Sequence, residues 1–282
     1  MNNIRKSFIV GIKGLKLKKN EIYFLQKYKP WGIILFSRNI KSIKQTRNLT
    51  NSIKKIFKDQ NYPIMIDEEG GNISRLKKII DTSIFSQKFF GQLYQNDKKK
   101  FKIYFSTYVK QISYVLTILG ININTVPVLD VYRSFSSKVL KDRCFSSNPN
   151  LASYLGDQCI KTFKKYGIAT VIKHIPGHGL ARVDSHLKLP KVKENLSDLK
   201  KIDFLPFKNK SSLLAMTAHI TYESIDKLYP ATHSSKVIKL IRNTIGFKHI
   251  IMSDDISMKA LKLSLRENTI RAFTAGCNLV LH

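Results

Sequence analysis

The chain has 282 residues, 43% of them hydrophobic, and no linker rich in Pro, Gly or Ser divides it, so it can form one large barrel or two ordinary domains. Its 49 basic and 19 acidic residues give a net charge of +30, but the lysines are spread along the whole chain in a way typical of an AT-rich genome, so no specific nucleic-acid partner is expected. The apolar run at residues 7–12 is too short for a secretory signal or a membrane span, and three cysteines without metal-ligand spacing (Cys144, Cys159 and Cys277) indicate reduced thiols in a cytoplasmic protein with no membrane association.

Short apolar runs alternate with longer segments of helical periodicity along the whole chain. In chain order, we predict strands at Phe8–Ile12, Gly32–Phe36, Pro63–Asp67, Asn124–Leu129, Ala169–Lys173, Leu214–Ala218, His249–Ser253 and Asn278–Leu281. Helical patterns between them include Ser42–Lys58, Phe101–Leu119, Leu151–Tyr166, Ser235–Thr244 and Leu265–Ala275. Strands alternating with helices predict an α/β fold, a single-domain (β/α)8 barrel of the TIM type over residues 1–282, which lacks its last helix.

Polar residues follow six of the eight predicted strands. In a parallel barrel the C-terminal strand ends meet at one mouth, which is where enzymes of this fold place their active sites. The polar ends are Ser37-Arg38, Asp67-Glu68-Glu69, Asp130, Lys173-His174, His219 and Ser253-Asp254-Asp255. This arrangement predicts a reactive centre at the mouth of the barrel.

The loop after the fifth predicted strand, residues 173–190, is crowded with titratable groups. Its glycines allow sharp turns, and loops on a rigid strand scaffold often carry catalytic groups. In Asp184-Ser185-His186 an imidazole follows a carboxylate by two residues, so His186 can both donate and remove a proton while Asp184 fixes its tautomer.

The same loop offers one metal-like spacing, His174 and His178, which are four residues apart. An i, i+4 pair binds a metal when it lies on a helix, but Pro176 and Gly177 between the two histidines forbid a regular helix. We therefore expect no metal site here.

Two further clusters contain adjacent acids. Asp67, at the end of its strand, can accept hydrogen bonds from ligand hydroxyls, although acids favoured by a helix start are the alternative interpretation. Neighbouring residues at a strand end point in different directions, so only one of Asp254 and Asp255 is expected to face the barrel axis. Asp254 is the better candidate nucleophile and Asp255 can orient it or cap the next turn, but an N-cap role remains open for either acid.

In order and spacing, these motifs resemble the family 3 glycoside hydrolases, and within them the β-N-acetylhexosaminidases of the bacterial cell-wall-recycling type. The resemblance spans nearly the whole chain, and the Lys-His-x-Pro-Gly-His-Gly run followed by Asp-Ser-His is highly specific to that branch. It implies a (β/α)8 barrel, a retaining mechanism and no metal or organic cofactor. The matching runs are 67–71, 143–146, 173–179, 184–186, 216–219 and 253–258.

The resemblance also implies roles for individual residues. Asp254 matches the nucleophile, His186 the acid/base and Asp184 the partner of that histidine. The positions that match the N-acetylglucosamine contacts are Asp67, Arg75, Arg143, Lys173 and His174. The implied protein is a cytoplasmic, monomeric exo-hydrolase whose partner is a small carbohydrate substrate, a muropeptide from which it removes terminal N-acetylglucosamine. Two alternatives remain: a truncated homologue that binds amino sugars without turnover, and a basic nucleic-acid-binding protein.

Overall fold

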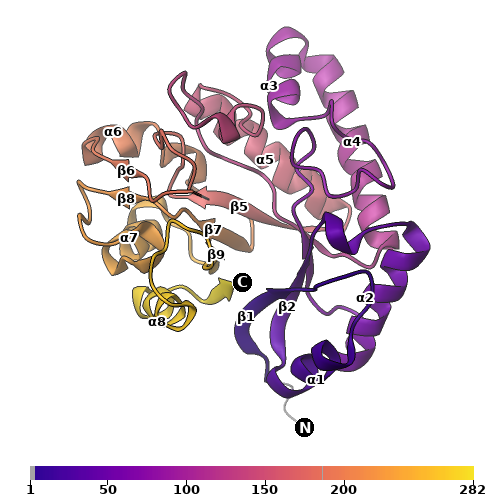
Figure 1. Cartoon of the computed structure of the whole chain (residues 1–282). Helices are drawn as coiled ribbons and strands as arrows, with labels where there is room; N and C mark the ends of the chain where they lie inside the picture. The colour runs from indigo at the N-terminus through magenta and orange to yellow at the C-terminus, as the bar shows by residue number, and fades with distance from the viewer. Residues whose placement is uncertain (1–3, 186) are drawn as a thin grey trace.

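The centre of the molecule is a closed barrel of eight parallel strands, seen in the computed structural model, which describes residues 4–185 and 187–282 (Figure 1). The barrel is closed by the pairing of its first and last strands, β1 and β10, in which Phe8 lies opposite Val280. Around the barrel the strands are β1 (Lys6–Gly11), β2 (Pro30–Leu35), β3 (Ile64–Ile66), β4 (Ile123–Asn124), β5 (Ala169–Ile175), β7 (Leu214–Thr217), β9 (Ile250–Asp255) and β10 (Leu279–Leu281). The predicted single-domain barrel is therefore confirmed, with every strand close to its predicted position.

Helices alternate with the strands and cover the outside of the barrel (Figure 1). They are α1 (Lys19–Tyr28), α2 (Ile43–Phe57), α3 (Gln87–Asn96), α4 (Lys98–Ile118), α5 (Pro149–Lys165), α6 (Leu196–Lys201), α7 (Ser235–Leu240) and α8 (Leu265–Ala275). A π-helical turn (Ile241–Ile245) extends α7, and β6 (Lys191–Val192) pairs with β8 (Thr221–Tyr222) outside the barrel. Short 3-10 turns lie at Ser37–Asn39, Lys138–Leu140, Leu205–Phe207 and Ala231–His233.

Polar caps explain where most helices begin. Seven of them follow a residue whose side chain accepts a hydrogen bond from a backbone amide of the first turn, which satisfies a donor that the helix itself leaves unpaired. In α2, the buried residues Leu49, Ile53 and Phe57 lie on one face, so the cap and the apolar pattern both favour a helix over these residues. The capping residues are Ser42, Ser86, Asp97, Asn148, Asn195, Ser234 and Ser264.

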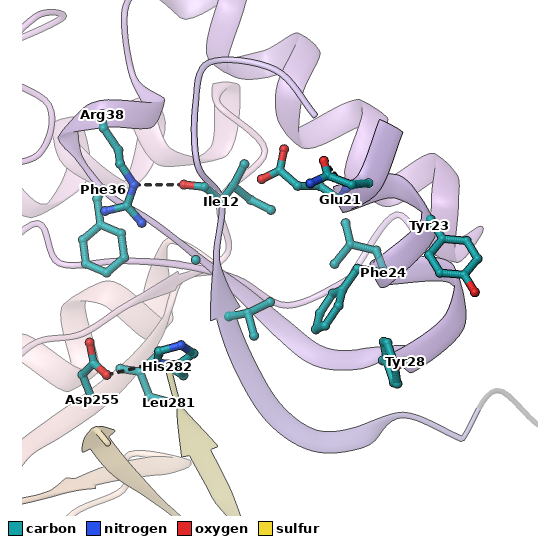
Figure 2. A pocket seen from close by; sticks show the side chains of 14 residues that line it. Ile12, Glu21, Tyr23, Phe24, Tyr28, Phe36, Arg38, Asp255, Leu281 and His282 are labelled. Atoms are coloured by element: carbon teal, nitrogen blue, oxygen red, sulfur yellow. Dashed lines mark hydrogen bonds and ion pairs between the residues drawn. The ribbon is translucent and has the colours of Figure 1, made fainter. Parts of the chain in front are cut away.

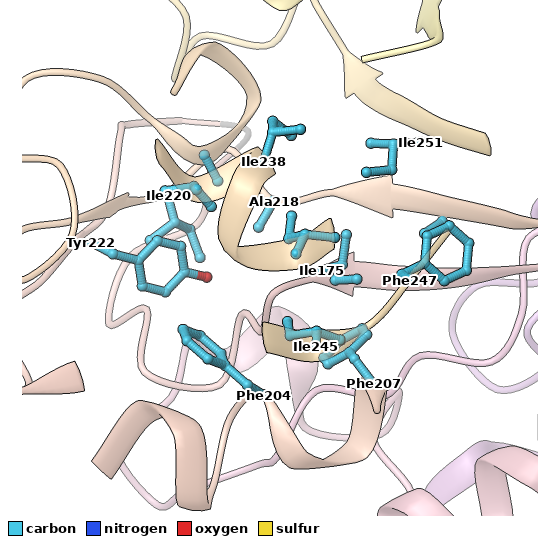
Figure 3. Packing of buried hydrophobic residues seen from close by; sticks show 14 of the residues in the cluster. Ile175, Phe204, Phe207, Ala218, Ile220, Tyr222, Ile238, Ile245, Phe247 and Ile251 are labelled. Atoms are coloured by element: carbon cyan, nitrogen blue, oxygen red, sulfur yellow. The ribbon is translucent and has the colours of Figure 1, made fainter. Parts of the chain in front are cut away.

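Three large clusters of buried side chains make up most of the hydrophobic core, beside a small one formed by Val128, Leu140 and Cys144. The barrel interior holds a layer that includes Ile9, Met65, Val171 and Met252. Outside the barrel, a first half-shell of buried side chains runs from β1 to α5, and a second half-shell runs from β5 to β10 and includes the residues of Figure 3. These three layers position the strand ends on which the functional side chains sit.

A cavity of about 900 Å³ lies beside β1, between α1 and the mouth of the barrel. Within the described ranges no helix follows β10, whose last residue also borders this cavity. Figure 2 shows Phe24 and Tyr28 of α1 along the cavity and Phe36 at its mouth end, near the pair formed by Asp255 and His282 (Oδ1 to Nδ1, 3.7 Å).

Candidate active site

The carboxyl ends of the strands surround a second, smaller pocket of about 170 Å³. Apolar side chains such as Phe36, Met216 and Met258 form part of its wall, and Glu69 and Asp255 also line it. It brings together six of the eight site residues expected from the sequence, namely Asp67, Arg75, Arg143, Lys173, His174 and Asp254.

Asp67, directly after β3, is held by three polar partners. Its Oδ1 accepts hydrogen bonds from the Thr125 hydroxyl and from Lys173 Nζ, the latter at 3.2 Å, and its Oδ2 lies 3.4 Å from Arg75 Nη2. Burial raises the pKa of this carboxyl, but the charges of Lys173 and Arg75 outweigh burial and hold the pKa well below its usual range. Asp67 is therefore ionised and able to accept hydrogen bonds from a ligand.

Glu69 joins two of the expected cations. Its Oε2 accepts from Arg143 Nε at 2.8 Å, and its Oε1 accepts from Arg143 Nη2 at 2.9 Å and contacts Lys173 Nζ at 2.6 Å. Burial favours a higher pKa, but Arg143 and Lys173 lower the pKa of Glu69 to about 2. The two-point contact fixes the plane of the guanidinium. We did not predict this role from the sequence, although the two-residue spacing from Asp67 was an available signal.

Glu68, which stands between Asp67 and Glu69 in the sequence, has a structural role. It is buried and accepts hydrogen bonds from the hydroxyls of Ser74 (3.1 Å) and Thr82 (2.7 Å) and from the Arg75 amide (2.7 Å). Gly70 follows with φ of 77°, and a Cβ there would collide with a backbone carbonyl. Glu68 and the glycine thus shape the loop that carries Arg75 to the pocket.

Asp130 orients His174. Its Oδ2 lies 2.7 Å from His174 Nδ1, and its Oδ1 accepts the backbone amide of His178 at 2.6 Å. Burial raises the pKa of Asp130, but His174 and the His178 amide and ring more than compensate, so that the carboxylate stays ionised. Because a carboxylate only accepts, Nδ1 of His174 carries the hydrogen. Its Nε2 then lies 3.5 Å from Nη2 of Arg143.

The adjacent acids at the end of β9 differ in their surroundings. Asp255 Oδ1 accepts from the amide and the hydroxyl of Ser257, at 2.9 and 2.7 Å, and so caps the following turn. Asp254 Oδ1 accepts the Asp255 amide at 2.8 Å, and within residues 4–185 and 187–282 its Oδ2 makes no hydrogen bond. Burial raises the pKa of Asp254, but His219, His174 and the Asp255 amide hold the pKa below its ordinary value. Asp254 is thus an ionised carboxylate with one oxygen open to a ligand.

The loop after β5 carries the remaining two expected residues. Asp184 does not line the pocket, and its backbone carbonyl accepts the amides of residues 187–188 at 3.0 Å each. His186, the expected acid/base, lies outside the described residues. His178 is buried, with Nε2 3.1 Å from Ser185 Oγ, and burial lowers its pKa to about 4. That contact joins two parts of the same loop, and Ser185 stands between the two expected catalytic residues in the sequence.

The described part of the chain offers neither a cluster of metal ligands nor a membrane-spanning helix. Residues 4–185 and 187–282 contain no group of three or more His, Cys, Asp or Glu side chains arranged to hold a metal ion. No helix in those ranges has both the length and the apolar character that crossing a membrane requires. The three cysteines are buried free thiols.

Comparison with known proteins relates this arrangement to one family. The family model described as the glycosyl hydrolase family 3 N terminal domain matches residues 5–282. Beta-hexosaminidase A of Pseudoalteromonas piscicida is 30% identical over 279 residues, which cover 91% of this chain and 46% of that protein. The beta-hexosaminidase of Alkalilimnicola ehrlichii is 32% identical over 279 residues, which cover 97% and 79%.

A solved structure is also similar to this chain. NagZ from Neisseria gonorrhoeae, in complex with N-trifluoroacetyl-D-glucosamine, superposes with a TM-score of 0.85 at 30% identity and covers 98% of this chain and 81% of its own. The chain thus spans about half the length of the Pseudoalteromonas protein and about four fifths of the other two.

Proposed function

The chain belongs to glycosyl hydrolase family 3, and from this membership we propose that residues 1–282 form a catalytic domain with β-N-acetylhexosaminidase activity. The observation that carries the proposal is the pocket, in which the ionised Asp254 with its open Oδ2 faces the same cavity as Asp67, Arg143 and Lys173. The names of the curated relatives, and the amino-sugar derivative bound by the Neisseria NagZ, support an N-acetylglucosamine substrate.

The sugar contacts follow from the charges in the pocket. The ionised Asp67 accepts hydrogen bonds from sugar hydroxyls, while Arg143 and Lys173 donate to the ring hydroxyls and the acetamido group, with Arg75 and His174 completing the site. Hydrogen bonds in which one partner is charged are stronger than neutral ones. Since Glu69 and Asp130 already hold these side chains in place, little conformational freedom is lost when the sugar binds.

The reaction that this arrangement supports is a retaining displacement. Oδ2 of Asp254 attacks the anomeric carbon as the bond to the leaving oxygen breaks, which gives a covalent glycosyl-enzyme that water then hydrolyses. His186, assigned by its motif, protonates the leaving oxygen and afterwards removes a proton from the attacking water, with Asp184 as its partner. A histidine in this role places no second anion beside the nucleophile.

The substrate class proposed is peptidoglycan fragments, in which N-acetylglucosamine is linked to a peptide-bearing anhydro-muramic acid. The support is the motif from Lys173 to Gly179 followed by Asp184-Ser185-His186, which resembles the cell-wall-recycling branch. The corresponding location is the cytoplasm, and the proposed active form is a monomer.

The test is hydrolysis of 4-nitrophenyl N-acetyl-β-D-glucosaminide by the purified protein, with the corresponding glucoside as the control. Release of nitrophenolate from the first substrate alone, with β-N-acetylglucosamine as the first product in NMR spectra, is the expected result. Binding of N-acetylglucosamine without hydrolysis would favour a sugar-binding homologue. Salt-sensitive retention of DNA that survives mutation of the pocket would favour the nucleic-acid alternative.

A further inference from the structure

His219 is a buried histidine of the barrel mouth that the proposed reaction does not use. It follows β7 and is 1% exposed, and it belongs to none of the sugar contacts described above. Both of its ring nitrogens are nevertheless engaged: Nε2 lies 3.0 Å from the carbonyl oxygen of Asp255, and Nδ1 lies 2.7 Å from Oγ1 of Thr232. A ring held at both nitrogens has a single orientation.

The tautomer of His219 follows from these partners. A backbone carbonyl only accepts hydrogen bonds, so Nε2 carries the hydrogen. Burial lowers the pKa of His219, so the neutral ring, whose Nδ1 accepts the Thr232 hydroxyl, is favoured. Thr232 Oγ1 is itself 2.8 Å from Oγ1 of Thr217, so a chain of hydrogen bonds runs from β7 through the ring to Asp255.

Asp255 is the residue next to the proposed nucleophile, and its backbone is held on both sides. Its carbonyl accepts from His219 and from the Met258 amide at 3.1 Å, and its own amide donates to Oδ1 of Asp254 at 2.8 Å. The turn that His219 anchors is therefore the turn whose amide fixes one oxygen of Asp254 and leaves the other open.

We propose that His219 is a positioning residue for Asp254, which acts through the backbone of Asp255 to hold the nucleophilic carboxylate in its attacking orientation. This role rests on the proposed glycosidase function. Attack by a carboxylate depends steeply on alignment, and a displacement of about 1 Å can cost on the order of a hundredfold in rate. Binding of the sugar depends on other side chains, so loss of His219 acts on kcat and not on KM.

The experiment compares three variants on the chromogenic N-acetylglucosaminide. His219→Leu removes the donor to Asp255 and should lower kcat about ten- to a hundredfold with KM within about twofold of wild type. His219→Gln keeps an N–H near the position of Nε2 and should recover kcat to within about fivefold of wild type. His233→Leu is the matched control and should leave both constants near wild type, because His233 is a buried histidine whose Nε2 has no hydrogen-bond partner within residues 4–185 and 187–282.

Hydrogen exchange supplies a readout that does not depend on turnover. Amides of residues 253–258 should exchange faster in His219→Leu than in wild type, His219→Gln or His233→Leu. Equal losses of kcat in the Leu and Gln variants, or unchanged exchange in His219→Leu, would overturn the positioning role. Absence of activity in the wild-type protein would refute the proposed function instead, and the exchange comparison would still decide whether His219 anchors the turn.

Discussion

Arg143 provides the most direct test of the sugar-binding side of the pocket. Arg143→Ala removes the guanidinium that Glu69 holds by two hydrogen bonds, at 2.8 and 2.9 Å. Glu69 is not left without a counter-charge, because Lys173 Nζ stays 2.6 Å from its Oε1. The variant should therefore fold, and its main loss should be the contact between the guanidinium and the sugar.

The size of that loss follows from the strength of one charge-assisted hydrogen bond, about 1.5–3 kcal/mol. At about 1.4 kcal/mol per factor of ten, kcat/KM should fall roughly ten- to 150-fold. Initial rates on the chromogenic N-acetylglucosaminide measure both constants. Arg5→Ala is the control, because Arg5 precedes β1 at the opposite end of the barrel and pairs with Asp59 at a partly exposed site. Wild-type kcat/KM in Arg143→Ala would show that this arginine does not contact the sugar.

Three further results are expected. Asp254→Asn should nearly abolish turnover of every substrate whatever its leaving group, and substantial activity in initial-rate assays would exclude it as the nucleophile. His186→Ala should still be glycosylated by a dinitrophenyl glycoside but then stall, and azide should release a β-glycosyl azide detectable by mass spectrometry; equal slowing of activated and natural substrates without azide rescue would mean that this histidine is not the acid/base. The pKa of His178 is about 4 in the folded protein and 6.5 in the unfolded chain, so between these pH values the unfolded chain takes up a proton that the folded protein does not. The free energy of unfolding should therefore fall as the pH drops from 6.5 to 4. In urea titrations His178→Gln should reduce this dependence on pH, and an unchanged dependence would contradict the reasoning.

The strands were predictable because each is a short apolar run, as expected for strands buried on both faces of a parallel barrel, and because six of the eight end in polar residues. The main error in length is β4, predicted at Asn124–Leu129 but limited to Ile123–Asn124. Pro127 has no backbone N–H for the ladder, so the pairing with β5 continues beyond Asn124 as an isolated bridge at Val128 and single hydrogen bonds such as that from the Leu129 amide to the Lys173 carbonyl. Helices α1, α3 and α6 were not predicted, and in α1 only Leu25 is buried, so its apolar pattern is weak.

The site was predictable at the level of residues but not of their partnerships. Strand ends indicate which side chains reach the mouth, and Asp67, Lys173 and Asp254 do line one pocket. Nothing in a single sequence shows that Glu69 joins Arg143 to Lys173, because that contact depends on how far apart the strand ends and the loop at residues 138–144 lie in space. Likewise, the sequence places His219 at the end of a strand, but it does not show that the ring contacts the backbone carbonyl of Asp255.

The two half-shells of the outer core bear on how the barrel comes apart. They meet at α5, where Leu155 and Phe163 pack in the first half-shell and Ile160 in the second. Parts of one fold whose local stabilities differ can open as separate cooperative units. If the half-shells differ in stability, native-state exchange should resolve two levels of protection, one for residues 6–168 and one for residues 169–281. Asp67 and Asp254 lie in different units, so the opening of either unit would disrupt the pocket. The lifetime of the active enzyme would then be set by the unit with the lower free energy of opening.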